Sequence, residues 1–238
     1  MPSPFVLIAL IASALAAWRR TRRGRWRPAR AVIVSPPRST VIARDGAVHS
    51  VQTAVLTLAD ADLRRLWSAP NLENLGRTYW RFLTRVTLGL IRVVYDHDSR
   101  SVVLLARPLT LLRFDVPRYE LSSDRGTVTW PIRDGLLVAR GGRGSGWLSL
   151  DVQRLPVAAD SDQREVRIEV EVANFYPSIA AGLSTFAYEM TQSFLHVLVT
   201  HAFLRSLANL RLDVSRIGAL AHRPTPHASP LEVPSDQP

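Results

Sequence analysis

The spacing of apolar residues changes along the chain, and each spacing predicts a different element. Over residues 164–173, valine and isoleucine alternate with charged residues. A period of two is typical of a strand with one buried face. From Ser178 to Leu210, apolar residues recur every three or four positions and no proline interrupts them. This spacing predicts a single helix of about 30 residues, which would run roughly 45 Å at 1.5 Å per residue.

The residues before these two elements show the same kinds of spacing, and this spacing predicts their secondary structure. It predicts a strand over 50–58, a helix over 60–68 capped by Asp60, and a helix over 71–86 capped by Asn71. Further strands are expected over 88–95, 101–106, 109–121, 127–133, 136–140 and 147–155. Pro117 indicates an edge position or a bulge, and Asp134-Gly135 indicates a tight hairpin.

These elements predict an α+β fold. Antiparallel strands joined by short turns need cover on one face, and the C-terminal helix is the only element long enough to provide it. We therefore expect a curved antiparallel sheet of about seven strands wrapped around that helix, with two short helices after the first strand. The space between a curved sheet and a helix is a natural position for a ligand.

Charge and composition divide the chain into four parts. Nine of the 30 basic residues precede Asp45, no acid does, and the remaining 21 basic residues face 20 acids. The folded part is thus nearly neutral, which argues against nucleic-acid binding. The chain contains no cysteine, so a disulfide, a thiolate metal site or a cysteine nucleophile is excluded. The predicted parts are an apolar segment with an arginine-rich arm (1–30), a linker (31–48), a folded domain (49–212) and a proline-rich disordered tail (213–238).

The N-terminal segment suggests contact with a membrane. Residues 4–18 are apolar and an arginine-rich run follows at once. An arginine excess beyond the apolar run predicts that the domain stays on the cytoplasmic side, with residues 4–27 at the membrane. Two alternatives stay open at this stage. One is a cleaved signal peptide, for which Ala14-Leu15-Ala16 resembles a cleavage site although no positive residues precede it. The other is a short arm that only lies on the surface.

The element order resembles the START-like, or helix-grip, superfamily, which includes polyketide cyclase-like and lipid-transfer members. The resemblance covers residues 50–212 and is carried by that order and by the passage REVRIEVEVANFYPSIAAGLSTFAYEM. It implies binding of a hydrophobic or amphipathic small molecule, lipid-like or polyketide-like, between the sheet and the C-terminal helix. No catalytic residue is carried over, because these differ between branches.

Large aromatic and polar residues on the predicted sheet and helices are the candidates for lining that cavity. They are Tyr79, Arg113, Tyr119, Trp130, Trp147, Phe186, Met190 and His196. We expect no cofactor and no metal, because His196 and His201 are poorly spaced for shared ligation on a helix. Two alternatives to simple binding remain. A cyclase or dehydratase would use Glu189, His196 or Arg113, and a membrane-tethered interaction module would have no cavity.

Overall fold

The computed structural model describes residues 28–34, 39–96, 98–105, 109–156, 161–178, 197 and 199–214. The predicted apolar anchor, most of the predicted C-terminal helix and the proline-rich tail lie outside these ranges.

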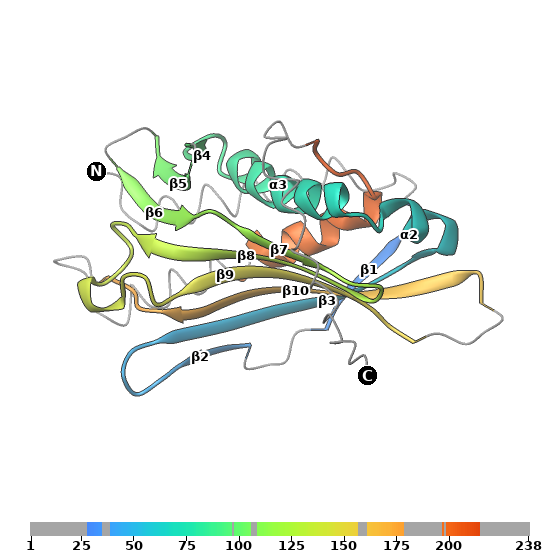
Figure 1. Ribbon diagram of the computed structural model, residues 1–238, viewed down its shortest axis with the longest axis horizontal. Helices are drawn as coiled ribbons and strands as arrows, with labels where there is room; N and C mark the ends of the chain where they lie inside the picture. The colour runs from blue at the N-terminus through green and yellow to red at the C-terminus, as the bar shows by residue number, and fades with distance from the viewer. Residues whose placement is uncertain are drawn as a thin grey trace, which may run out of the picture.

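A single antiparallel sheet forms the frame of the molecule (Figure 1). Its main path runs β1-β3-β10-β9-β8-β6-β5-β4, with β2 paired to β3 and β7 paired to β8. The ten strands are β1 (Arg30–Ile33), β2 (Thr40–Ile42), β3 (Val48–Ala59), β4 (Ile91–Tyr95), β5 (Ser99–Leu104), β6 (Thr110–Asp115), β7 (Arg118–Leu121), β8 (Arg125–Asp134), β9 (Trp147–Arg154) and β10 (Gln163–Phe175). The long strands β3 and β10 pair over most of their length and form the centre of the sheet.

Two helices follow β3, as predicted. They are α2 (Asp60–Leu66) and α3 (Ala69–Val86). Ser68 caps α3 by accepting a hydrogen bond from the backbone N–H of Asn71, and a proline stands in the first turn. The cap therefore comes three residues before the predicted Asn71. Asp60 lies in the first turn of α2, where it pairs with Arg64 and Arg164 at 2.8 and 2.9 Å.

The described part of the C-terminal helix comprises residue 197 and residues 199–206, followed by the 3₁₀ turn η2 (Leu207–Asn209). His201 fixes it to the sheet by donating a hydrogen bond of 2.7 Å to Oε1 of the buried Gln52 on β3. Gln52 in turn donates to the Ser39 hydroxyl at 2.8 Å. Burial, together with the nearby Arg205, lowers the pKa of His201.

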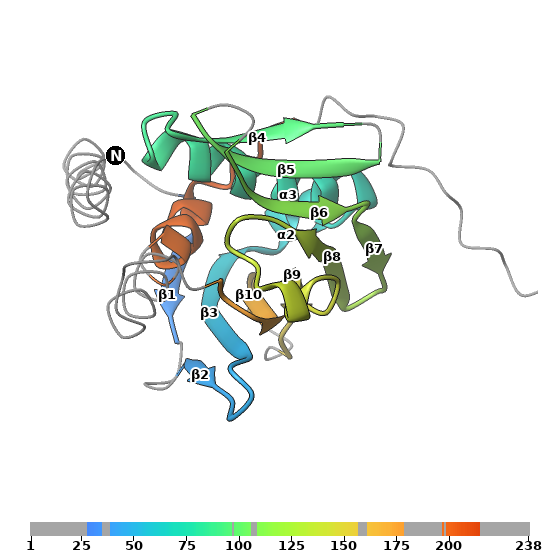
Figure 2. The same ribbon diagram turned by 90° about the vertical axis from the view of Figure 1, so that its left-hand side faces the viewer.

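The sheet is curved, and the helices lie on its concave side. Seen from one end, it bends from β2 and β3 through β9 and β8 to β5 and β4 (Figure 2), with α3 and the C-terminal helix inside the bend. Alternation sends Leu56, Val166 and Leu150 inward, where each is buried, and leaves charged residues of β10 on the outer face. This is the helix-grip arrangement that the sequence predicted, with ten strands in place of about seven.

The additional strands correct the predicted linker at 31–48. β1 pairs with β3 from Arg30↔Thr57 to Ile33↔Ala54, and β2 pairs with the start of β3. β1 pairs with residues far along the chain, whereas β2 forms a local hairpin with the start of β3. Both strands are short. The local pattern therefore carried little sign of them.

Two further strand predictions also change. The predicted strand 109–121 divides at Pro117 into β6 and β7, both of which pair with β8, so the predicted interruption is confirmed. The predicted strand 136–140 is wrong. After Gly135, Leu136 and Leu137 donate backbone hydrogen bonds to Thr110 and Leu111 instead of returning along β8. The 3₁₀ turn η1 (Arg140–Gly142) follows.

Aromatic side chains fill the centre of the bend. Trp80 of α3 packs edge-on against Trp130 of β8, with ring centroids 5.2 Å apart, and Tyr79 packs likewise against Phe203 at 5.1 Å. Gly76 allows α3 to approach this closely, because a Cβ atom there would lie 2.8 Å from the Trp130 ring. Among the described residues, aromatic side chains therefore fill the space between α3 and β8.

Candidate functional site

An apolar pocket lies beside this aromatic centre, where α2 and the start of α3 cross the sheet. Its volume is about 90 Å³ and it is partly open to solvent. It is lined by Leu56, Leu58, Leu63, Leu66, Trp67, Ser68, Asn71, Leu72, Leu75, Leu121, Gly126, Val152, Val166, Ile168, Leu207, Leu210 and Leu212. None of these side chains is charged at neutral pH.

Four strands supply the floor of the apolar pocket. Val152 of β9 lies beside Gly126 of β8, and Val166 of β10 lies beside Leu56 of β3 in the strand register. These residues share the inner face because successive side chains alternate across a strand. Gly126 has no side chain, which lets Leu121 and Leu72 pack directly over its backbone. A Cβ atom there would lie 3.0 Å from Leu121 Cδ1 and 3.5 Å from Leu72 Cδ1.

The helices and the C-terminal segment supply the walls. Leu63 and Leu66 come from α2, and Leu72 and Leu75 come from α3. The chain then reaches the pocket again after the C-terminal helix, because Leu210 adopts a left-handed conformation with φ of 53° that ends η2. The segment beyond is held against α3, since the Asp213 N–H donates to the Thr78 hydroxyl at 2.8 Å and its carboxylate pairs with Arg81.

Among the described residues that line the pocket, three carry polar side-chain groups, and each of these groups is hydrogen-bonded within the protein. The Trp67 indole N–H donates to the Ser122 carbonyl at 3.0 Å, and Ser68 serves as the cap of α3. The Asn71 side chain donates to the Arg65 carbonyl at 3.2 Å. The interior of the pocket therefore offers a ligand burial of apolar surface and no group that could take up or release a proton.

None of the five described residues predicted to bind a ligand lines this pocket. Tyr79 and Trp130 belong to the aromatic core, with 5% and 1% of their surface exposed. Burial raises the pKa of Tyr79 to about 12, and the neighbouring Thr200 hydroxyl opposes that rise. Trp147 is half-buried at the start of β9. The other three predicted residues, Phe186, Met190 and His196, lie outside the described residues.

Arg113 and Tyr119 are placed in two other environments. Arg113 is paired with Asp134 at 3.2 Å, and 41% of its side chain is exposed, so it does not face a cavity. Tyr119 packs in a polar junction with Tyr95 and Arg100. Burial raises its pKa to about 12, and the Arg100 guanidinium opposes the rise. The Arg100 guanidinium lies 5.5 Å from the centroid of the Tyr95 ring, so this junction ties β5 to β4.

The residues that do line the pocket were visible in the sequence, although they were not chosen as the site. Leu63, Leu66 and Trp67 form the apolar side of α2, and Val166 and Ile168 form the inward positions of β10. The sequence did not show which side chains fill the centre of the fold. Large aromatic residues fill it, and the apolar pocket lies among aliphatic residues beside them.

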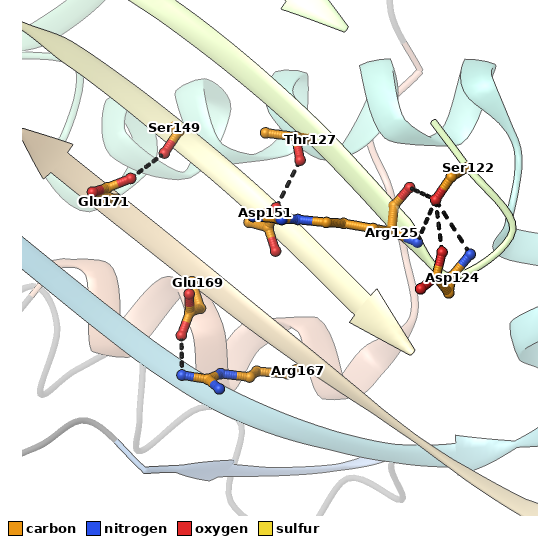
Figure 3. A network of polar contacts seen from close by, with 9 residues as sticks. All are labelled: Ser122, Asp124, Arg125, Thr127, Ser149, Asp151, Arg167, Glu169 and Glu171. Atoms are coloured by element: carbon orange, nitrogen blue, oxygen red, sulfur yellow. Dashed lines mark hydrogen bonds and ion pairs between the residues drawn. The ribbon is translucent and has the colours of Figure 1, made fainter. Parts of the chain in front are cut away.

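The outer face of the sheet carries a network of polar side chains (Figure 3). Asp151 accepts hydrogen bonds of 2.7 Å from both Arg125 and Thr127, and Glu171 accepts one of 3.1 Å from Ser149. Asp151 and Glu169 are direct cross-strand neighbours, and Arg167 pairs with Glu169 at 2.5 Å. Among the described residues, no group of three histidines or acids is arranged to hold a metal ion. The network thus offsets repulsion between neighbouring carboxylates.

Comparison with known proteins found only weak similarities, all of them to solved structures. No family model matches the chain, and no curated protein matches it. Similar solved structures include norcoclaurine synthase from Thalictrum flavum, with 12% identity over 72% of this chain and 87% of that chain and a TM-score of 0.33. Human STARD10 has 9% identity over 82% and 78% with a TM-score of 0.31, and human StAR-related lipid transfer protein 5 has 10% over 87% and 99% with a TM-score of 0.28.

At these identities and TM-scores the similarity says nothing about ligand or reaction. The class is therefore defined by the molecule itself. A curved antiparallel sheet closes around α3 and the C-terminal helix, and β3 to β10 follow the helix-grip order with α2 and α3 inserted after the first of them. The chain is a helix-grip α+β protein with an apolar pocket beneath α2. Over the residues that the structure describes, no helix is both long and apolar enough to cross a membrane.

Proposed function

We propose that this protein binds an apolar or amphipathic small molecule in the pocket beneath α2. The observation that carries the proposal is the pocket itself, whose walls and floor come from leucine, isoleucine and valine side chains of six elements and the C-terminal segment. Burying apolar surface in such a site contributes about 0.8 kcal/mol per methylene group.

The size of the pocket limits the part of the ligand that it holds. Its volume of about 90 Å³ is well below the roughly 300–1,000 Å³ of sites that enclose drug-sized ligands. It suits a segment of an alkyl chain or a small apolar ring, with the rest of the ligand at the open side.

Binding is a better account of this lining than catalysis. A cyclase or dehydratase needs an acid or base within hydrogen-bond reach of its substrate, and no titratable side chain of the described residues lines the pocket. Of the three residues predicted for such an enzyme, Arg113 lies elsewhere in an ion pair with Asp134. Glu189 and His196 lie outside the described residues. The interaction module is disfavoured for a different reason, because it was predicted to have no cavity.

Filling the pocket tests the proposal. Val152→Phe places a ring on its floor, and we expect it to weaken binding of 1-octanol at least tenfold, as measured by calorimetry or by titration of backbone NMR signals. Val55→Phe is the matched control, because Val55 lies on the opposite face of the same sheet and does not line the pocket. Equal affinity of Val152→Phe and the unaltered protein, or no binding of octanol by the unaltered protein, would refute the proposal.

The same proposal places the domain at the cytoplasmic face of a membrane through residues 4–27. It is supported by the apolar run and by the arginines that follow it. Deleting residues 1–27 is expected to move the protein from the membrane fraction to the soluble fraction of fractionated cells. Deletion of residues 215–238 serves as the control. An unchanged membrane fraction after the first deletion would contradict this placement.

A further inference from the structure

Arg154 stands at the edge of the apolar pocket. It ends β9, and alternation places it on the same inner face as Leu148, Leu150 and Val152. Val152 lines the pocket, and Val166, the register partner of Arg154 on β10, lines it as well. The Arg154 side chain therefore leaves the sheet next to the pocket floor.

Trp67 holds the guanidinium group at this position. The guanidinium carbon of Arg154 lies 4.2 Å from the centroid of the Trp67 ring, within the range of a cation–π contact. Trp67 is itself a wall of the pocket, and its indole is fixed by the hydrogen bond to the Ser122 carbonyl. The charge is thus ordered before any ligand arrives, which lowers the entropy cost of binding.

Among the described residues, Arg154 has no acidic partner of the kind that neighbouring arginines have. Arg125 pairs with Asp151 at 2.7 Å and Arg164 pairs with Asp60 at 2.9 Å. Within the described part of the chain no carboxylate lies at ion-pair distance from Arg154, and its Nε atom is buried without a hydrogen-bond partner. A guanidinium in such a position gains most from an anionic acceptor, which it can bind through two parallel hydrogen bonds.

We propose that Arg154 makes this pocket selective for anionic amphiphiles, in which an alkyl chain ends in a carboxylate or a phosphate. The chain occupies the apolar pocket, and the head group lies at the rim against the guanidinium. The inference rests on the proposed binding function and adds the chemical class of the ligand to it.

The experiment compares ligands with one tail and different head groups. Octanoate, octyl phosphate and 1-octanol are titrated into the full-length protein and into Arg154→Met. We expect the unaltered protein to bind at least one of the two anions about tenfold more tightly than octanol. Arg154→Met is expected to lose that preference while its affinity for octanol stays within twofold. Arg118→Met is the control, because it removes the same charge from an exposed position on β7.

Two results would overturn the inference. In one, the unaltered protein binds all three ligands equally. In the other, the preference for an anion persists in Arg154→Met. In both cases octanol still binds, so the proposed function stands. If octanol fails to bind, the proposed function fails, and the inference that rests on it fails as well. Salt provides a second readout that needs no variant, since raising it to 0.5 M should weaken binding of the anion and leave octanol unchanged.

Discussion

Replacing Trp130 by alanine is expected to lower the free energy of unfolding by about 3–5 kcal/mol. Only 1% of Trp130 is exposed, and its ring packs against Trp80 and against the backbone of α3 at Gly76. The sequence predicted this tryptophan to contact a ligand. Its position in the aromatic centre makes it a core residue, so its removal leaves a cavity that the neighbouring elements cannot close.

Denaturant unfolding of the variant measures this loss, and Trp130→Phe supplies the control. Phenylalanine keeps an aromatic ring and removes the indole N–H, which is buried in the protein without a hydrogen-bond partner. An unpaired buried donor costs about 1–3 kcal/mol, so the control should lose much less stability than the alanine variant. Octanol affinity should stay unchanged in Trp130→Phe. Two results would contradict a core role for Trp130. One is a loss of less than about 1 kcal/mol in the free energy of unfolding of Trp130→Ala, and the other is a tenfold loss of octanol affinity in Trp130→Phe, which would indicate contact with the ligand.

The elements with a regular period and a long run could be predicted from the sequence. The alternation in β10 and the apolar side of α3 lie within about two residues of the predicted bounds. β1 could not be predicted, because it has four residues and is stabilised by pairing with a distant part of the chain, from Arg30↔Thr57 to Ile33↔Ala54. β2 has three residues, which are too few to show a period, although it forms a local hairpin with the start of β3.

The apolar pocket does not coincide with the residues that the sequence suggested as ligand contacts. An apolar lining followed from the fold, but the largest aromatic side chains were chosen as its members. In the structure these residues pack against one another, as in the pairs Tyr79–Phe203 and Trp80–Trp130. The pocket lies instead where aliphatic side chains such as Leu56, Val152 and Val166 face α2 and the start of α3. Such a gap depends on how side chains from distant elements fit together, which composition and spacing do not record.

Arg113 and Arg154 show how the environment of an arginine depends on residues far away in the chain. Arg113 was chosen because it stands inside an apolar strand, but Asp134 neutralises it at the exposed side of β6. Arg154 was not predicted to contact a ligand, because the residues before it alternate as in an ordinary strand. The proposed role of Arg154 rests on its contact with Trp67 and on the lack of an acid beside it among the described residues. Both depend on residues far away in the chain.

Replacing Gly135 by alanine is expected to lower the free energy of unfolding by about 3–5 kcal/mol, as much as Trp130→Ala. Gly135 adopts φ of 144°, a conformation that residues with a side chain rarely reach. A Cβ atom there would lie 2.2 Å from the Leu111 carbonyl oxygen and 2.8 Å from the Leu112 Cα atom. These are backbone atoms of β6, so a side-chain rotation cannot relieve the contact.

Gly144→Ala separates the two causes of this loss. Gly144 also has a positive φ, 75°, but nothing lies within 4 Å of the position that its Cβ atom would occupy. Its replacement should therefore cost only the backbone strain, about 1 kcal/mol. We expect the thermal midpoint of Gly135→Ala to fall several times further than that of Gly144→Ala. Equal losses would mean that the chain after β8 can move away from β6. In that case the hydrogen bonds from Leu136 and Leu137 to Thr110 and Leu111 would not hold this corner of the sheet together.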